Sequence, residues 1–361
     1  MIIGLPKELK NNEFRVGMLP WMVKELTLLG HTVLVEKDAG LGAGADNQEY
    51  LEAGAELKDS NIDIWDEAEL IVKVKEPISE EYSLIKKDQI IFTYLHLAPN
   101  KELTKVLLDS GSTALAYETL SVNGQLPLLT PMSIIAGKLA SSVGAELLKK
   151  PFGGKGKLIG GLPGVKPAKV LILGAGAVGF AAAEVAYGMG ASVTVLDIDT
   201  MKLTNIYNHF HGHVEPLLSN PVNLKSEIKE TDILIGGVLI PGEKAPKLVS
   251  RELISTMGKG SILVDVAIDQ GGCIEGSLPT THENPTINYD DKIIYSVANM
   301  PGSVPITSTA ALTNATYRYI KALASLGLAE SIKALPEIES AINIDKGEIK
   351  NFAVAKAYFA N

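Results

Sequence analysis

Three glycines and a later aspartate form the pattern with the clearest chemical meaning in this sequence. An apolar stretch at residues 170–173 leads directly into Gly174-x-Gly176-x-x-Gly179, and Asp197 follows 18 residues later (197 − 179). The first glycine of such a motif permits a tight turn, the second lets the backbone approach a pyrophosphate, and the third lets a helix pack closely on a strand. The helix start directs N–H groups at the phosphates, and a carboxylate about 20 residues on binds the ribose hydroxyls. The pattern predicts a dinucleotide-binding site, and the alternative is a glycine-rich packing turn without a ligand.

Two cationic residues have the chemistry to bind a small acid. Arg15 has a planar guanidinium that can bind a carboxylate through two hydrogen bonds, although an ordinary surface arginine is the alternative. Lys75 follows Lys73 in an alternating segment and directly precedes Glu76-Pro77. An alternating strand with a solvated polar face explains Lys73. Lys75 is the better candidate, because it stands where a proline ends the strand.

Two further residues can move protons. His96 lies in an apolar segment, where a histidine is commonly a hydrogen-bonded core residue, but imidazole is also the usual proton carrier near neutral pH. Asp265 and Asp269 lie in a second apolar segment, and a buried carboxylate needs partners. Asp265 therefore fits a structural role, and Asp269, beside Gly271-Gly272, is the better functional candidate. Ligands of open α/β sheets bind beyond the carboxyl ends of the strands, so residues that follow predicted strands can face one cleft.

The elements expected around these residues alternate between strands and helices, as in parallel α/β sheets. In the first part of the chain we expect strands at 2–5, 32–36, 69–75, 90–95 and 113–117, and helices at 21–29 and 101–108, the second capped by Asn100. After a helix at 134–148 and a glycine-rich stretch at 153–164, we expect strands at 170–173, 192–196, 233–238, 262–267 and 293–297. A helix at about 308–326 is expected to return the chain to the first domain.

The predicted fold class is therefore α/β, with two doubly wound parallel-sheet domains. A Rossmann domain for NAD at residues 129–306 is inserted in a discontinuous substrate domain made of residues 1–128 and 307–361. A chain of 361 residues is long for one core and suits two domains.

Composition limits the function classes. The net charge is −9 (33 − 42) without a basic block, so we expect no nucleic-acid partner. The single cysteine, Cys273, excludes an internal disulfide. We expect no signal peptide and no membrane span, because the longest apolar run, residues 170–183, is interrupted by glycines; both expectations favour the cytoplasm. His209, His211 and His213 alternate on a segment expected to be an exposed helix end or loop, so we expect no metal site.

The chain resembles the alanine dehydrogenases, a family related to the NAD-binding subunit of proton-pumping transhydrogenase, over nearly its whole length. The resemblance is carried by Gly4-x-Pro-Lys-Glu-x-Lys-x-x-Glu13-x-Arg15-Val, Val72-Lys-Val-Lys75-Glu-Pro77, Tyr94-Leu-His96-Leu-Ala98, Thr130-Pro-Met-Ser133, Gly174-Ala-Gly-Ala-Val-Gly179, Val264-Asp-Val-Ala-Ile-Asp-Gln-Gly-Gly272 and Val297-Ala-Asn-Met-Pro-Gly302.

The resemblance implies reversible oxidative deamination of L-alanine to pyruvate and ammonium with NAD⁺, by a cytoplasmic homohexamer. It implies that Arg15 and Lys75 bind the substrate and that His96 and Asp269 transfer protons. The cofactor contacts that it implies, beyond Gly174, Gly176 and Gly179, are Ser133, Ala177, Asp197, Lys202, Ser219, Val238, Leu239, Val266, Ala267, Ile268, Asp269, Val297, Ala298, Asn299 and Met300. Asp197 and Asp199 are expected to repel the 2′-phosphate of NADP, which Lys202 would partly offset.

The sequence departs from the family pattern at a few positions. Ile134 and Lys138 stand where the family commonly has an acidic and then a basic residue, and Ile306 and Leu278 replace basic residues. Two other functions remain open: a dehydrogenase for another small L-amino acid, and a transhydrogenase-like NAD-binding module without its own chemistry, which would not need Lys75 and His96. A catalytically silent NAD-responsive regulator is a weaker alternative. The volume of the substrate pocket would decide between amino acids, and Met132, Tyr94 and Asn299 are the expected lining residues.

Overall fold

The protein forms two compact units, each built on its own sheet. The computed structural model describes residues 1–238 and 245–359. One unit combines the segments Met1–Met132 and Gly302–Asn361, and the other is the segment Ser133–Pro301. The sequence places these boundaries after residues 128 and 306. The chain is thus α/β, with one continuous and one discontinuous unit.

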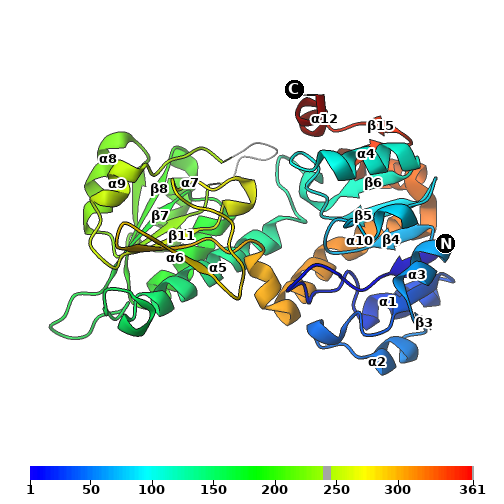
Figure 1. Ribbon diagram of the computed structural model, residues 1–361, viewed down its shortest axis with the longest axis horizontal. Coiled ribbons are helices and arrows are strands. Elements are labelled where there is room, and N and C mark those ends of the chain that lie inside the picture. Colours follow the sequence, from blue (N-terminus) through cyan, green and yellow to red (C-terminus); the bar gives the residue numbers. More distant parts are fainter. Residues whose placement is uncertain (239–244, 360–361) are drawn as a thin grey trace. The chain divides into compact units, whose positions relative to one another are not determined.

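The first unit contains an eight-stranded sheet (Figure 1). Its strands are β1 (Ile2–Leu5), β2 (Thr32–Glu36), β3 (Glu56–Lys58), β4 (Leu70–Val72), β5 (Ile90–Thr93), β6 (Thr113–Ala116), β14 (Ile342–Asp345) and β15 (Glu348–Ile349). Their order is β15-β14-β6-β5-β4-β1-β2-β3, and β1 to β6 are all parallel. The winding reverses between β1 and β4, which is where ligands of such sheets bind. The edge formed by β14 and β15 is antiparallel and was not expected from the sequence.

Seven helices accompany this sheet within the described residues. They are α1 (Pro20–Leu28), α2 (Asn47–Glu52), α3 (Asn61–Glu67), α4 (Lys101–Ser110), α10 (Pro305–Ala334), α11 (Ile338–Ala341) and α12 (Phe352–Phe359). The predicted cap of α4 is confirmed, because the side chain of Asn100 accepts the N–H of Leu103 at 3.0 Å. Gly327, with φ 71°, interrupts α10 directly after the end predicted for this helix.

The second unit contains a seven-stranded sheet with the same winding. Its strands are β7 (Lys169–Leu173), β8 (Ser192–Asp197), β9 (Glu215–Leu218), β10 (Ile233–Gly236), β11 (Ile262–Asp265), β12 (Thr286–Tyr289) and β13 (Lys292–Tyr295), and its helices are α5 (Thr130–Leu147), α6 (Ala177–Gly188), α7 (Thr200–His209), α8 (Pro221–Glu227) and α9 (Arg251–Ser255). The strand order is β12-β13-β11-β10-β7-β8-β9, and only β12 is antiparallel. The winding reverses between β7 and β10. The predicted doubly wound parallel sheets are therefore present in both units.

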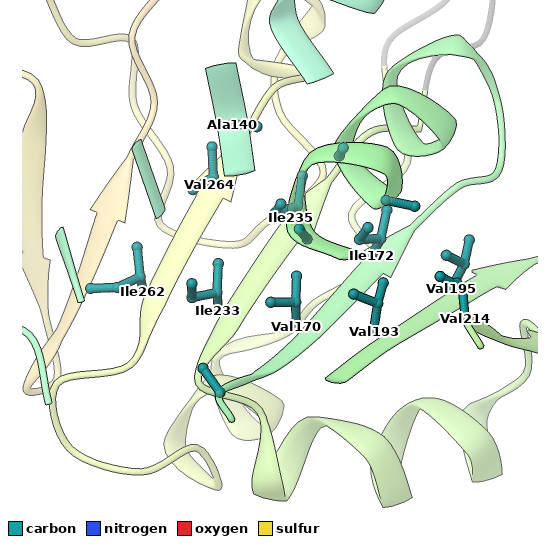
Figure 2. Packing of buried hydrophobic residues seen from close by; sticks show 14 of the residues in the cluster. Ala140, Val170, Ile172, Val193, Val195, Val214, Ile233, Ile235, Ile262 and Val264 are labelled. Carbon is teal, nitrogen blue, oxygen red and sulfur yellow. The ribbon is translucent and has the colours of Figure 1, made fainter. Parts of the chain in front are cut away.

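Alternate residues of the central strands form the core of the second unit. Figure 2 shows Val170 and Ile172 of β7 on the same sheet face as Ile233 and Ile235 of β10, and all four are buried. Helix α5 packs against this face at Gly144, where a Cβ atom would lie 2.8 Å from Cγ2 of Ile233. A glycine is therefore required for this close approach between helix and sheet.

A buried carboxylate ties the glycine-rich stretch before β7 to this sheet. Asp232, directly before β10, accepts hydrogen bonds from Lys155 Nζ at 2.8 Å and Lys157 Nζ at 2.6 Å. It also accepts the N–H of Lys169 at 2.9 Å. Burial alone would raise the pKa of Asp232, but the two lysines outweigh burial and lower it.

None of the helices within the described ranges is long and apolar enough to cross a membrane.

Candidate active site

Three of the predicted site residues lie in loops at the carboxyl edge of the first sheet. Arg15 follows β1, Lys75 follows β4 and His96 follows β5. These strands are neighbours in the order β5-β4-β1 and are parallel, so their three loops emerge from the same edge of the sheet. Arg15 and Lys75 thus follow the two strands between which the winding reverses.

Arg15 is a buried residue rather than a surface arginine. Its side chain is 2% exposed, and Nε donates to Glu13 Oε1 at 2.7 Å while Nη2 donates to Glu13 Oε2 at 2.5 Å. Nη1 contacts Met132 Sδ at 3.1 Å. Burial would lower the pKa of Arg15, but Glu13 outweighs burial and raises it. The guanidinium therefore keeps its charge, and Glu13 fixes its orientation through two hydrogen bonds.

The prediction that Lys73 lies on a solvated strand face is wrong. Strand β4 ends at Val72, and Lys73 is 1% exposed. Its Nζ lies 2.7 Å from Glu81 Oε1 and 3.5 Å from Glu8 Oε2. Burial would lower the pKa of Lys73, but the two carboxylates outweigh burial and raise it. An alternating pattern cannot reveal this, because both partners come from other segments of the chain.

Glu8 also supports the loop that carries Lys75. Its Oε1 accepts the N–H of Val74 at 2.6 Å and that of Lys75 at 3.4 Å. Lys75 is half-buried, and the next residue, Glu76, forms an ion pair with Lys10. Burial would raise the pKa of Glu76, but the charges of Lys75 and Lys10 lower it. Lys75 is thus a partly accessible cation in a loop held by carboxylates.

His96 has an unusual backbone conformation and is only partly buried. Its φ is +47°, in the left-handed region that non-glycine residues rarely adopt. Its N–H donates to Glu118 Oε1 at 2.6 Å, and its ring is stacked on Tyr94 with centroids 6.0 Å apart. The buried hydroxyl of Tyr94 donates to the carbonyl of Leu128 at 2.6 Å. His96 is therefore not enclosed in the core, and its backbone and ring each have a defined neighbour.

In the second unit the glycine motif has the conformation that pyrophosphate binding needs. Gly174 has φ +98°, and a Cβ at Gly179 would overlap the Gly174 carbonyl oxygen. A Cβ at Gly176, by contrast, would have no described heavy atom within 4 Å. Helix α6 begins at Ala177, and no side chain in the described chain caps it. Its first-turn N–H groups and the open space at Gly176 therefore fit an anionic phosphate group.

Asp197 ends β8 beside this turn. Its Oδ2 accepts the N–H of Ala175 at 2.6 Å, and its Oδ1 accepts the N–H of Asp199 at 2.8 Å. Its backbone carbonyl accepts the N–H of Ser219 at 2.8 Å. Each carboxylate oxygen keeps a second lone pair that can accept from a ribose hydroxyl. The carboxylate thus holds the glycine turn and can bind a sugar at the same edge.

The remaining predicted cofactor residues mostly follow strands of the second sheet. Ser219 follows β9, Val238 follows β10, residues 266–269 follow β11 and residues 297–300 follow β13. Ser133 lies near the start of α5, and Lys202 is exposed on α7. Leu239 lies outside the described residues. All but Ser133 and Lys202 of the described set therefore lie at the carboxyl ends of strands, as the ligand rule requires.

The two aspartates at and after the end of β11 differ in environment. Asp265 is buried and accepts the N–H groups of Cys273 at 3.1 Å and Ile274 at 3.0 Å, which confirms its predicted structural role. Asp269 is exposed in a short turn that begins at Ile268. Of the two, only Asp269 is exposed.

The departures from the family pattern lie at the surface. Ile134, Leu278 and Ile306 are exposed, and Lys138 forms an ion pair with Glu184 at 2.9 Å. None of these residues contributes a hydrogen bond to Arg15, Lys75 or His96 among the interactions described above.

The alternating histidines lie at and after the end of α7, as predicted, and are exposed. In the described ranges, no cluster of three or more His, Cys, Asp or Glu residues could hold a metal ion.

Sequence reasoning missed the carboxylates that hold the site, namely Glu8, Glu13 and Glu118. The sequence holds no signal for Glu118, because its contact with the N–H groups of Leu95 and His96 depends on the pairing of β5 with β6 in the folded sheet. Glu13 has a weak signal, since a buried arginine needs an anion and Glu13 is two residues away.

Comparison with known proteins agrees with this arrangement. Residues 4–136 match the family model described as alanine dehydrogenase/PNT, N-terminal domain, and residues 140–351 match the C-terminal domain of the same family. A relative from Methanococcus maripaludis named alanine dehydrogenase is 50% identical over 360 residues, covering 99% of this chain and 96% of that protein. A Bacillus subtilis protein of the same name is 48% identical over 357 residues, covering 99% and 94%.

Solved structures show the same relationship. A structure of L-alanine dehydrogenase superimposes with a TM-score of 0.95 at 48% identity and covers 99% of both chains. A transhydrogenase from Sinorhizobium meliloti shares the fold, with a TM-score of 0.81 at 24% identity, covering 98% of this chain and 100% of that one. With two family models spanning nearly the whole sequence and relatives near 50% identity, this chain belongs to the alanine dehydrogenase/PNT family.

Proposed function

We propose that this protein is an NAD-dependent L-alanine dehydrogenase, which converts L-alanine, NAD⁺ and water to pyruvate, ammonium, NADH and a proton, and catalyses the reverse reaction. The observation that carries the proposal is the identity of 48–50% over 98–99% of the chain to relatives named alanine dehydrogenase. The charged loops after β1, β4 and β5 support it, because an NAD-binding module without chemistry would not need Lys75 and His96.

The second unit supplies the proposed cofactor site. The glycine motif and the start of α6 would bind the pyrophosphate, and Asp197 would bind the adenosine ribose. When bound, NAD⁺ supplies a nicotinamide ring that accepts a hydride from the substrate Cα. The other contacts proposed are those that the family resemblance implies, from Ser133 to Met300, with Leu239 among them.

The first unit supplies the proposed substrate site. Arg15 would bind the carboxylate of alanine or pyruvate, since Glu13 holds its guanidinium in one orientation inside a buried environment. Lys75 would hydrogen-bond the substrate oxygen from its partly exposed loop. Glu13 balances the charge of Arg15, so Lys75 would supply the positive charge that stabilises the carbonyl oxygen of pyruvate or the oxygen of a carbinolamine intermediate.

Proton transfer is assigned to His96 and Asp269. Deamination needs a base that removes a proton from the water that adds to the iminium carbon, and an acid that protonates the departing amine. An imidazole can do both in turn near neutral pH. Asp269, exposed after β11, would exchange protons or hydrogen-bond the amino group of the substrate.

The first experiment is NADH formation with NAD⁺ and a panel of L-alanine, L-serine, glycine and L-2-aminobutyrate. The proposal expects the highest kcat/KM with L-alanine. Turnover of only a bulkier amino acid would keep the mechanism but change the substrate. Tight NADH binding without turnover of any panel member would instead favour the NAD-binding module.

We also propose a strong preference for NAD over NADP. A 2′-phosphate would lie near the buried carboxylate of Asp197, with Asp199 close by and only the exposed Lys202 to offset them. The kcat/KM ratio for the two cofactors tests this, and equal values would contradict it. We further propose a cytoplasmic homohexamer on the basis of the resemblance, which light scattering of the purified protein tests.

A further inference from the structure

The backbone at His96 is held by a carboxylate from the neighbouring strand. Strand β5 ends at Thr93, so the N–H groups of Leu95 and His96 lie beyond its hydrogen-bond ladder. The register pairs Thr93 with Ala116 of β6, and Glu118 lies in the short 3-10 turn Tyr117–Thr119 that follows β6 directly. Glu118 Oε1 accepts the N–H of His96 at 2.6 Å. The backbone nitrogen of Leu95 lies 3.2 Å from each of the two carboxylate oxygens, and its N–H donates to both.

The peptide group that Glu118 anchors leads directly into an unfavourable conformation. A non-glycine residue in the left-handed region costs about 1–2 kcal/mol and persists only where its surroundings hold it. His96 has φ +47°, and two successive N–H groups that converge on one anion form a strong, charge-assisted contact. Without an acceptor at this place, the peptide group that precedes the left-handed turn at His96 loses its anchor.

The imidazole is defined by a second contact on the same segment. Its ring is stacked on Tyr94 with an angle of 12° between the planes. The Tyr94 hydroxyl is itself fixed by the carbonyl of Leu128. The direction of the imidazole thus depends on the backbone turn at His96, because a rotated backbone would move the ring off Tyr94.

We propose that Glu118 is a positioning residue for His96: it anchors the peptide group from which the left-handed turn at His96 starts, and this anchor directs the imidazole toward the substrate. This inference rests on the proposed function, in which His96 transfers protons. It assigns to Glu118 no contact with the substrate and no proton transfer. A hydrogen-bond acceptor at this position, rather than a negative charge, is what the role requires.

Two near-isosteric variants of Glu118 test whether the position needs a hydrogen-bond acceptor or a negative charge. Glu118→Gln keeps a carbonyl oxygen that can accept both N–H groups, whereas Glu118→Met has a similar shape without a strong acceptor. We expect Glu118→Met to lower kcat about tenfold to a hundredfold, the range for a misplaced catalytic group, and Glu118→Gln to stay within about threefold of the original protein. KM for pyruvate is expected to change less than about threefold in both, since Arg15 and Lys75 lie on other loops. Rates are expressed per NADH-binding site, so that unfolded protein does not count.

The matched control is Glu69→Met. Glu69 also accepts a backbone N–H, from Ile2 at 2.6 Å, but lies at the amino end of the same sheet. Its replacement is expected to leave kcat unchanged. Equal kcat losses in Glu118→Gln and Glu118→Met would overturn the proposal, because the charge would then matter and not the acceptor. An unchanged kcat in Glu118→Met would overturn it as well.

A measurement that does not depend on activity keeps this inference distinct from the proposed function. Hydrogen exchange of the peptide that spans residues 94–99 should be at least about tenfold faster in Glu118→Met than in Glu118→Gln. Equal exchange in the two variants would refute the backbone contact whatever the enzyme does. A protein that shows this difference but turns over no amino acid would refute the proposed function and leave the contact intact.

Discussion

The buried ion pair of Glu13 and Arg15 allows a quantitative prediction for the change Glu13→Ala. Both side chains are at most 2% exposed, so the variant leaves a guanidinium in the interior without the carboxylate that binds two of its nitrogens. Removing one partner of a buried pair costs about 3–5 kcal/mol, because the remaining charge stays desolvated. With a urea dependence of about 2–3 kcal/mol per molar for a unit of this size, the unfolding midpoint should fall by about 1–2.5 M.

Tryptophan fluorescence reports the unfolding of the structural unit that contains Glu13. The chain has two tryptophans, Trp21 in α1 and Trp65 in α3, and both belong to the unit that contains Glu13. Trp65 is fully buried, so its emission should shift when this unit unfolds. Unfolding of the second unit would add no tryptophan signal.

An exposed ion pair in the same unit is the control. Glu330 and Lys333 lie 2.6 Å apart on α10 but are 59% and 71% exposed. Glu330→Ala should therefore cost no more than about 1 kcal/mol. If Glu13→Ala and Glu330→Ala lower the midpoint equally, then burial does not set the strength of the Glu13 contact and the argument for Arg15 is wrong.

Three further predictions concern His96, the glycine motif and acid stability. His96→Ala should lower kcat about 10²- to 10⁴-fold and leave the Kd for NADH nearly unchanged, and wild-type turnover would remove His96 from the mechanism. Gly176→Ala should raise the Kd for NADH at least about tenfold without a change in unfolding temperature, because the added methyl group would meet no heavy atom of the described residues within 4 Å. Gly179→Ala should instead lower the stability by about 1–3 kcal/mol, because its methyl group would overlap the carbonyl oxygen of Gly174. Calorimetry and NADH titration of both variants test these two expectations. The folded-state pKa of Asp232 is lowered, so its stabilisation is full above the unfolded value near 3.9 and is lost as the pH falls through the folded value. Calorimetry between about pH 5 and 2 should therefore show a smaller acid dependence for Asp232→Asn, and parallel curves for the two proteins would contradict the lowered pKa.

Local patterns were enough to predict much of this fold. The strand, glycine turn and helix from Lys169 to Gly188 are specified by adjacent residues, and so is the Asn100 cap. The loops after parallel strands were also predictable, because the ligand rule depends only on strand ends. These features need no knowledge of distant contacts.

Features that depend on distant residues were not predictable in the same way. The alternating pattern predicts a solvated Lys73, but in the folded protein Glu8 and Glu81 lie against its ammonium group and the side chain is buried. Strand β14 pairs with β6 across more than two hundred residues, and no residue pattern in either strand identifies the other as its partner. The role of Glu118 requires the register between β5 and β6, which is a property of the assembled sheet.

The pairing of β14 with β6 also has a consequence for the order in which the protein can fold during its synthesis. Residue Leu115 emerges from the ribosome long before its partner Ile342. During that interval the second unit, which is continuous in sequence, can fold completely, while β6 remains an open edge with unsatisfied backbone groups. The nascent first unit is therefore the part of the chain most exposed to wrong strand pairing, and its protection by chaperones should matter most before residues 342–345 have been made.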